Sequence, residues 1–253
     1  MLVAITRAIS PSFGSCELTH LERAPIDIEL ARSQHRGYER CLAGSGCEIH
    51  RLPAEPHLPD SVFVEDVAVI LDELAVIALP GAFSRRPEVA LVADAIAPLR
   101  PLRRVEAPGT LEGGDVLRIG DRLFVGRSTR TNDEGIDQLR TLVAPHGYTV
   151  SGVEIERCLH LKSAATLVAD DTLLVNPAWV DLRGFDEVER VEVDPSEHQA
   201  ANALRVGEVV ILPAAHPRTR ERLERRGIST VPVEVSEIAK AEGGVTCCSL
   251  IVD

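Results

Sequence analysis

The stretch Leu111-Glu112-Gly113-Gly114-Asp115-Val116-Leu117, followed after a turn by Arg122-Leu123-Phe124-Val125-Gly126, is one of five copies of a single pattern in this 253-residue chain. Two strand-like apolar runs flank a short turn in each of the first four copies, as in a β-hairpin, and the fifth copy runs into the C-terminus. The other copies begin with Val64-Glu65-Asp66-Val67, Leu159-His160-Leu161-Lys162, Asn202-Ala203-Leu204-Arg205 and Thr246-Cys247-Cys248-Ser249. Equivalent positions lie 42 to 48 residues apart, a period typical of one supersecondary unit repeated along the chain.

Repeats of this kind stack or close into a ring, because one unit cannot bury its own apolar face. In a closed ring, equivalent positions all face the axis. Three of the copies present Glu112, His160 and Cys247 at the equivalent position. The sequence therefore predicts that a carboxylate, an imidazole and a thiol meet at the centre of the molecule.

The segments between the hairpins predict an α/β architecture. Apolar residues at helical spacing predict helices over 87–99, 133–143 and 218–225, the last ending at Gly227, and a shorter helix-like stretch over 179–188. A further strand is predicted after each helix, at 104–106, 149–151, 191–193 and 231–233.

The fifth hairpin has no helix after it, so the N-terminal segment has to complete its unit. That segment predicts a strand at 2–7, a helix over 26–42 and a strand at 48–51. Residues 1–253 are thus expected to form a single catalytic domain whose fifth unit is closed by both chain ends. The intervening residues 8–25 have no apolar period, and irregular segments of this length are typically lids or binding loops.

Composition excludes several classes of protein. A net charge of −12 argues against nucleic acid as a partner and suits a cationic small substrate. No apolar run approaches the roughly 18 residues of a membrane-spanning helix, and the N-terminal run lacks the basic residues of a signal peptide. Six cysteines in a chain of this size do not indicate a disulfide framework, so we expect a reducing, cytoplasmic location.

Cys247, His160 and Glu112 together predict covalent catalysis. A thiol needs a base or a positive neighbour to act as a nucleophile, and His160 can supply either. The imidazole can also protonate a leaving amine, while Glu112 orients it. Gly113-Gly114 and Gly243-Gly244 beside two of these residues allow the backbone to approach closely.

Glu65 and Asp66 occupy the same phase in the first copy. Carboxylates that face an enclosed pocket need a cation, which a cationic substrate would supply. Metal binding is the rival use of such residues, but no zinc or EF-hand spacing occurs in the sequence. We therefore expect neither a metal site nor a cofactor.

With these residues in view, the chain resembles the dimethylarginine dimethylaminohydrolases of the pentein, or guanidino-group modifying, superfamily. The resemblance rests on motifs spread along most of the chain, and their combination is specific. These motifs are Asp60-Ser61-Val62-Phe63-Val64-Glu65-Asp66, Leu111-Glu112-Gly113-Gly114-Asp115, Ser128-Thr129-Arg130-Thr131-Asn132, Leu159-His160-Leu161-Lys162-Ser163 and Gly243-Gly244-Val245-Thr246-Cys247-Cys248-Ser249-Leu250.

The resemblance implies a five-bladed α/β propeller in which ββαβ repeats surround a central active-site channel. It implies Cys247 as the nucleophile on a guanidinium carbon, with a covalent thiouronium intermediate. His160 would protonate the departing amine and then activate water, and Glu112 would position His160. Cys247 is favoured over Cys248 because it follows Thr246, and because alternation along a strand would turn Cys248 away.

The resemblance also implies the residues that bind substrate. Glu65 and Asp66 would hold the guanidinium group, and Leu18 would be the lid residue over the ligand. The remaining contacts would come from Arg85 and Arg130, to the substrate α-carboxylate, and from Asp60. Ala241 stands where the family often has a larger residue near the amino-acid end of the substrate.

The activity implied is hydrolysis of N-omega-methylated L-arginine to L-citrulline and methylamine or dimethylamine. An arginine deiminase and an amidinotransferase are rivals of the same superfamily, although they are usually longer and carry an extra helical module. A non-catalytic, ribosome-binding protein of pentein fold is the alternative from another class, and the triad argues against it. A small-molecule substrate is the expected partner, and a homodimer is the candidate assembly.

Overall fold

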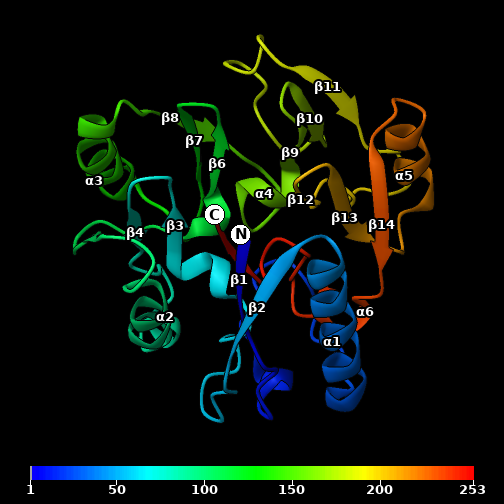
Figure 1. The fold of residues 1–253 in the computed structure, drawn as a ribbon, viewed down its shortest axis with the longest axis horizontal. Helices are drawn as coiled ribbons and strands as arrows, with labels where there is room; N and C mark the ends of the chain where they lie inside the picture. The colour runs from blue at the N-terminus through cyan, green and yellow to red at the C-terminus, as the bar shows by residue number, and fades with distance from the viewer. Residues whose placement is uncertain (1) are drawn as a thin grey trace.

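The structure is a computed structural model that describes residues 2–253. These residues form five three-stranded sheets, each an antiparallel pair extended by a parallel third strand. The sheets are β3–β4–β5 (Ala68–Ile70, Ala75–Ile77, Leu102–Arg104), β6–β7–β8 (Val116–Ile119, Arg122–Arg127, Thr149–Glu154), β9–β10–β11 (Ala165–Ala169, Thr172–Val175, Glu189–Glu192), β12–β13–β14 (Leu204–Val206, Val209–Pro213, Ser229–Val233) and β15–β1–β2 (Leu250–Val252, Leu2–Arg7, Cys47–Leu52). The sheets surround a common centre (Figure 1), which confirms the predicted five-bladed α/β propeller.

Helices cover the outer side of this ring (Figure 1). The longer ones are α1 (Ile28–Gly44), α2 (Glu88–Ile96), α3 (Asp133–Val143) and α5 (Pro217–Glu224). Two of them begin at polar caps, because Asp27 and Asn132 accept backbone N–H bonds from Leu30 and Gly135. The short helices are α4 (Leu161–Ala164), α6 (Ser236–Ala239), η1 (Phe13–Ser15), η2 (Val64–Val67), η3 (Phe83–Arg85), η4 (Gly113–Asp115) and η5 (Ala144–His146).

One predicted helix is wrong. Residues 179–188 form turns rather than a helix, and the third unit connects β10 to β11 without one. Gly184 lies within this stretch with φ +96°, a conformation that a right-handed helix does not contain. The connection instead packs through Phe185, whose ring stacks on Phe124 of β7 with centroids 4.3 Å apart.

In each predicted hairpin, the first strand is also longer than the strand that the structure shows. Each first strand begins several residues later than expected, and a helical turn precedes it in four units: η2, η4, α4 and the turn at 246–249. These turns lie where the units meet, so their backbone groups bond across units; for example, Glu65 N donates to Cys247 O at 3.1 Å. Cys247 lies in one of these turns and not in a strand, so alternation along a strand does not decide between Cys247 and Cys248.

The fifth sheet contains both ends of the described chain. β1 pairs antiparallel with β15, with Val3 opposite Val252, and parallel with β2. This arrangement supports the single closed domain, which stays a prediction. Buried apolar side chains form five clusters, consistent with one core region for each neighbouring pair of units.

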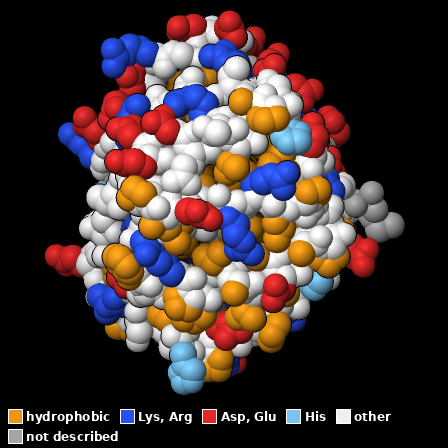
Figure 2. Space-filling view, turned by 90° about the vertical axis from the view of Figure 1, so that its left-hand side faces the viewer, with side chains coloured by type: hydrophobic (Ala, Val, Ile, Leu, Met, Phe, Trp, Pro, Cys, Tyr) orange, Lys and Arg blue, Asp and Glu red, His pale blue; other side chains and the backbone are white. Residues whose placement is uncertain are grey.

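On the outer side that carries α2 and α3, apolar side chains are interspersed with charged ones (Figure 2). Phe83 of η3 is 78% exposed and Leu91 of α2 is 42% exposed. Among residues 2–253, no helix combines the length and apolar character needed to cross a membrane.

Candidate active site

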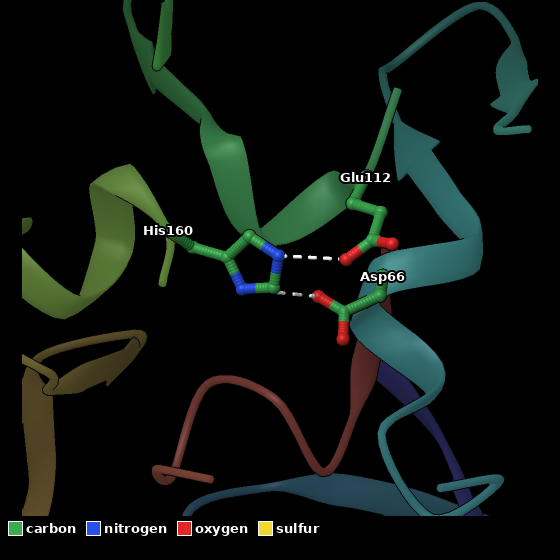
Figure 3. A group of neighbouring side chains, drawn as sticks. All are labelled: Asp66, Glu112 and His160. Carbon is green, nitrogen blue, oxygen red and sulfur yellow. Dashed lines mark hydrogen bonds and ion pairs between the residues drawn. The ribbon is translucent and has the colours of Figure 1, made fainter. Parts of the chain in front are cut away.

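Glu112 and His160 form a buried pair at the centre of the ring (Figure 3). Glu112 immediately precedes η4 and His160 immediately precedes α4, both with extended backbone. His160 Nε2 lies 2.7 Å from Glu112 Oε2. The equivalent positions of two repeats therefore do meet, as the period predicted.

Asp66 approaches the other nitrogen of the same ring (Figure 3), with its Oδ1 3.7 Å from His160 Nδ1. Gly114 makes this approach possible, since a Cβ there would lie 2.7 Å from both Asp66 Oδ1 and His160 Nδ1. The close backbone approach predicted for this glycine pair is confirmed. The imidazole is thus held between two carboxylates.

These carboxylates keep the imidazole charged. Burial opposes the charged form, but Asp66, Asp115 and the hydrogen bond to Glu112 outweigh it and raise the pKa of His160 to about 9. Burial likewise opposes ionisation of Glu112, but His160, Arg85 and Arg130 lower its pKa to about 2. At neutral pH the pair is therefore an imidazolium and a carboxylate, and His160 holds a proton that it can give away.

Asp66, Glu112 and His160 could place ligand atoms within 4.8 Å of one another, close enough to surround a metal ion. The imidazolium already neutralises these carboxylates at neutral pH, and a metal ligand has to be a neutral imidazole. The expectation of no metal stays a prediction.

Cys247 lies in the turn that joins Gly243-Gly244 to β15. Its Sγ accepts a hydrogen bond from Gly244 N at 3.3 Å and lies 3.9 Å from Thr246 Oγ1. Burial, with the nearby charges of Glu65 and Asp66, raises the pKa of the thiol to about 12. Without a cationic ligand, Cys247 is therefore a neutral thiol.

Cys247, His160 and Asp66 line one small cavity, together with Arg85, Arg130, Asp60, Phe63, Glu17, Leu159 and residues 241–243. The cavity has a volume of about 20 Å³, enough for about one water molecule. An amino acid cannot fit in this space, so the structure is a closed state that has to open before a substrate binds.

Arg85 is fully enclosed and already has acidic partners. Its Nη1 donates to Asp66 Oδ2 at 2.6 Å, and its Nη2 donates to Glu88 Oε2 at 2.8 Å. The carbonyl oxygens of Asp60 and Phe63 accept further bonds from Nη2. The predicted role of Arg85 as a ligand for a carboxylate stays a prediction, because a carboxylate would have to compete with these partners.

The side chain of Arg130 has fewer hydrogen-bond partners than that of Arg85. Its Nη2 donates to Thr19 Oγ1 at 3.2 Å, and its Nη1 lies 3.6 Å from Glu112 Oε1. Thr19 belongs to the predicted lid. The lid therefore binds the guanidinium of Arg130, which was expected to bind the substrate carboxylate.

Glu65 does not line this cavity. Its Oε1 accepts from Lys162 Nζ at 2.6 Å, and its Oε2 accepts from Thr246 Oγ1 at 2.7 Å. The carboxylate therefore braces the residue beside Cys247 in this closed state. Its predicted contact with a guanidinium stays a prediction.

The segment 8–25 covers the cavity as a lid. Leu18 is half-buried against the apolar cluster that contains Phe63 and Cys247. Glu17 N donates to both carboxylate oxygens of Asp60, at 3.1 and 3.2 Å. Asp60 lines the cavity and Leu18 does not, and the predicted roles of both remain predictions.

Comparison with known proteins found relatives along nearly the whole chain. A dimethylarginine dimethylaminohydrolase of Pseudomonas aeruginosa is 39% identical over 235 residues, which cover 92% of each chain. One of Streptomyces coelicolor is 40% identical over 248 residues, covering 98% of this chain and 95% of the relative. The chain belongs to the dimethylarginine dimethylaminohydrolase family. A scan against protein-family models found no match.

Solved structures of dimethylarginine dimethylaminohydrolases agree with this assignment. A cysteine-to-serine variant of the Pseudomonas aeruginosa protein, complexed with citrulline, superposes with a TM-score of 0.94 at 37% identity and covers 98% of both chains. A histidine-to-glycine adduct with S-methyl-L-thiocitrulline also has a TM-score of 0.94, at 36% identity. A cyanobacterial arginine dihydrolase domain, 16% identical with a TM-score of 0.86, shares the fold.

Several residues around this dimethylarginine dimethylaminohydrolase site were not predicted. Glu88 binds Arg85 from three residues further along, and burial raises its pKa to about 7 against the attraction of Arg85. Lys162 and Thr246 lie in the motifs quoted above, but no role was predicted for either. The available signal for Lys162 was its charge, which is opposite to that of Glu65. No role was predicted for Asp115. Its carboxylate accepts a hydrogen bond from Leu161 N at 3.0 Å and so fixes the backbone next to His160.

Proposed function

We propose that the protein hydrolyses N-omega-methylated L-arginine to L-citrulline and methylamine or dimethylamine. Membership of the family supports this reaction. The observation that carries it is that the Cys247 thiol and the His160 imidazolium line one small cavity, and that the Glu112 carboxylate bonds to His160. A nucleophile and an acid at the same cavity are what cleavage of a guanidinium C–N bond needs.

The reaction begins with binding of the guanidinium cation, which favours the thiolate of Cys247, and the thiol proton passes to solvent. Sγ then bonds to the guanidinium carbon. His160 gives its proton to the methylated nitrogen, the C–N bond breaks, and a thiouronium remains on Cys247. Neutral His160 next takes one proton from water, whose oxygen bonds to the carbon. The C–S bond then breaks, and the second proton of the water is lost to solvent as the ureido C=O forms. The product is citrulline, and Cys247 leaves as a thiolate.

The direct test is citrulline release from asymmetric dimethylarginine, monomethylarginine and arginine, with Cys247→Ser as the blank. We expect citrulline from the methylated substrates in stoichiometric yield with the amine. Citrulline from none of the three would overturn the proposal, and citrulline from arginine alone would make the protein a deiminase.

The pH dependence of turnover is expected to shift when substrate binds. A guanidinium next to Cys247 stabilises the thiolate, so the pKa of the thiol falls below its free-enzyme value of about 12. The rising limb of kcat, which reports the bound enzyme, is therefore expected at lower pH than the rising limb of kcat/KM. In the free enzyme the thiol pKa of about 12 lies above the His160 pKa of about 9, so kcat/KM is expected to rise with a midpoint near pH 9 and kcat to rise below that. Coincident rising limbs in the two pH profiles would contradict activation by substrate.

Arg130→Ala is expected to raise KM for dimethylarginine by about one to two powers of ten, because a bond to a buried charged group is worth roughly 1.5–3 kcal/mol. The reaction with agmatine, which lacks the carboxylate, is expected to stay poor and unchanged. Glu65→Gln is expected to impair both substrates, since the guanidinium is common to them. Equal, small effects of Arg130→Ala on both would show that Arg130 does not bind the carboxylate.

We further propose that residues 1–253 act as one catalytic domain in the cytoplasm and assemble as a homodimer. All six cysteines are free, which supports a reducing compartment. The exposed Phe83 and Leu91 on one outer side support self-association. Sedimentation velocity on the purified protein measures the assembly directly.

A further inference from the structure

Glu242 occupies an unusual position between the lid and the nucleophile. It lies five residues before Cys247, in the turn that follows α6, and its backbone is left-handed with φ +57°. A non-glycine residue pays a conformational cost there. The turn keeps Glu242 half-buried and directs it toward the lid.

The carboxylate of Glu242 accepts three consecutive backbone N–H groups of the lid. Thr19 N lies 3.0 Å from both oxygens, and His20 N and Leu21 N each lie 2.5 Å from Oε1. Successive N–H groups that converge in this way form a concave anion site, and hydrogen bonds to an ionised acceptor are the strong ones. The lid thus wraps its backbone around a single side chain of the turn that leads to Cys247.

Glu242 also lies between two pockets. Together with Leu159 and Gly243 it lines both the closed cavity and a larger pocket of about 300 Å³. The lid residues His20 and Leu21 form part of the wall of the larger pocket. Release of the lid from Glu242 would join the two spaces.

We propose that Glu242 is a positioning residue that latches the lid over Cys247 and His160, and that the larger pocket is the vestibule through which substrate reaches them. This inference rests on the proposed function for the identity of the substrate. The latch itself is a property of the fold and can be tested without turnover.

Trypsin cleavage after Arg23 measures lid release. Arg23 lies in the lid, and its guanidinium donates to Gly14 O at 2.8 Å and Cys16 O at 2.6 Å. Arg23 is exposed, but these bonds hold the chain around it, and a protease needs that stretch in an extended conformation, so the cleavage rate follows how often the lid is released. Loss of charge-assisted bonds of this kind shifts an equilibrium by roughly ten- to a hundredfold. We expect cleavage after Arg23 to accelerate about tenfold in Glu242→Gln and up to about a hundredfold in Glu242→Ala.

Glu234→Gln is the matched control. Glu234 is an exposed carboxylate on the wall of the larger pocket, and the described residues give it no hydrogen bond to the lid. Its cleavage rate is expected to equal that of the wild type, while Glu242→Asp, which keeps the charge on a shorter side chain, is expected to fall between wild type and Glu242→Gln. The fragment 1–23 is quantified by mass spectrometry, and an unchanged melting temperature confirms that cleavage reports the lid.

The activity readout then separates a latch from a purely structural residue. Because the lid has to open before substrate enters, Glu242→Gln is expected to bind dimethylarginine faster in stopped-flow measurements, while kcat falls because the lid covers bound substrate for less of the time. Cleavage within twofold of wild type in both Glu242→Gln and Glu242→Asp would overturn the latch, whatever happens to activity. Faster cleavage in a protein that makes no citrulline would uphold the latch and refute the proposed reaction.

Discussion

Cys247→Ser is expected to abolish citrulline formation, whereas Cys248→Ser is expected to retain most of the activity. Only Cys247 lines the cavity that His160 and Asp66 share. Cys248 is turned the other way, where its Sγ donates to Gly244 O at 3.6 Å and only 1% of the residue is exposed. A serine hydroxyl in place of Cys247 cannot form the thiouronium.

The two variants control for each other, because they make the same chemical change one residue apart. Steady-state citrulline assays and alkylation with a guanidine-bearing haloacetamidine both distinguish them. If Cys248→Ser were the inactive variant, the assignment of the nucleophile would be wrong.

His160→Gly is expected to reduce kcat by at least about 10²–10⁴-fold, the usual contribution of general acid–base catalysis. The leaving amine would depart without a proton, and the thiouronium would lack a base to activate water. Samples quenched during turnover are therefore expected to carry substrate-derived mass on Cys247. Near-native turnover of this variant would refute the role of His160.

Added imidazole provides the control for His160→Gly. The substitution removes the cation between Asp66 and Glu112, so Glu112 loses its hydrogen-bond partner, while Asp66 keeps its bond to Arg85. Imidazole that restores activity would show that the missing function is the proton donor and not the fold. No rescue, with a melting temperature far below that of the wild type, would indicate that the pair mainly stabilises the protein.

The sequence predicted the architecture because repetition is visible without coordinates. The period placed Glu112, His160 and Cys247 at the centre, and the structure finds Glu112 and His160 2.7 Å apart. The predicted strand boundaries are wrong where tertiary contacts override the local preference for secondary structure. Residues 64–67 and 113–115 were expected to begin strands but form helical turns, and in the first of these Glu65 N bonds to Cys247 O of another unit.

The sequence could not predict which residues pair with the buried charged side chains. Repeat phase predicts that Glu65 points inward, and the family resemblance implies the same for Arg85, but neither predicts that Lys162 and Glu88 neutralise them. The Glu65–Lys162 pair depends on side-chain reach between two units, which residue spacing does not specify. The same holds for Glu242, whose bonds to the lid join residues more than 220 positions apart.

The pairing of β1 with β15 has a consequence for how the protein folds. Its contacts, such as Val3 with Val252, span nearly the whole sequence, and contacts of high sequence separation form late because a long loop has to close first. The first four sheets can each assemble from one local stretch of chain, but the fifth cannot. The turn that carries Cys247 leads directly into β15, so on refolding, helical signal is expected to return before enzymatic activity.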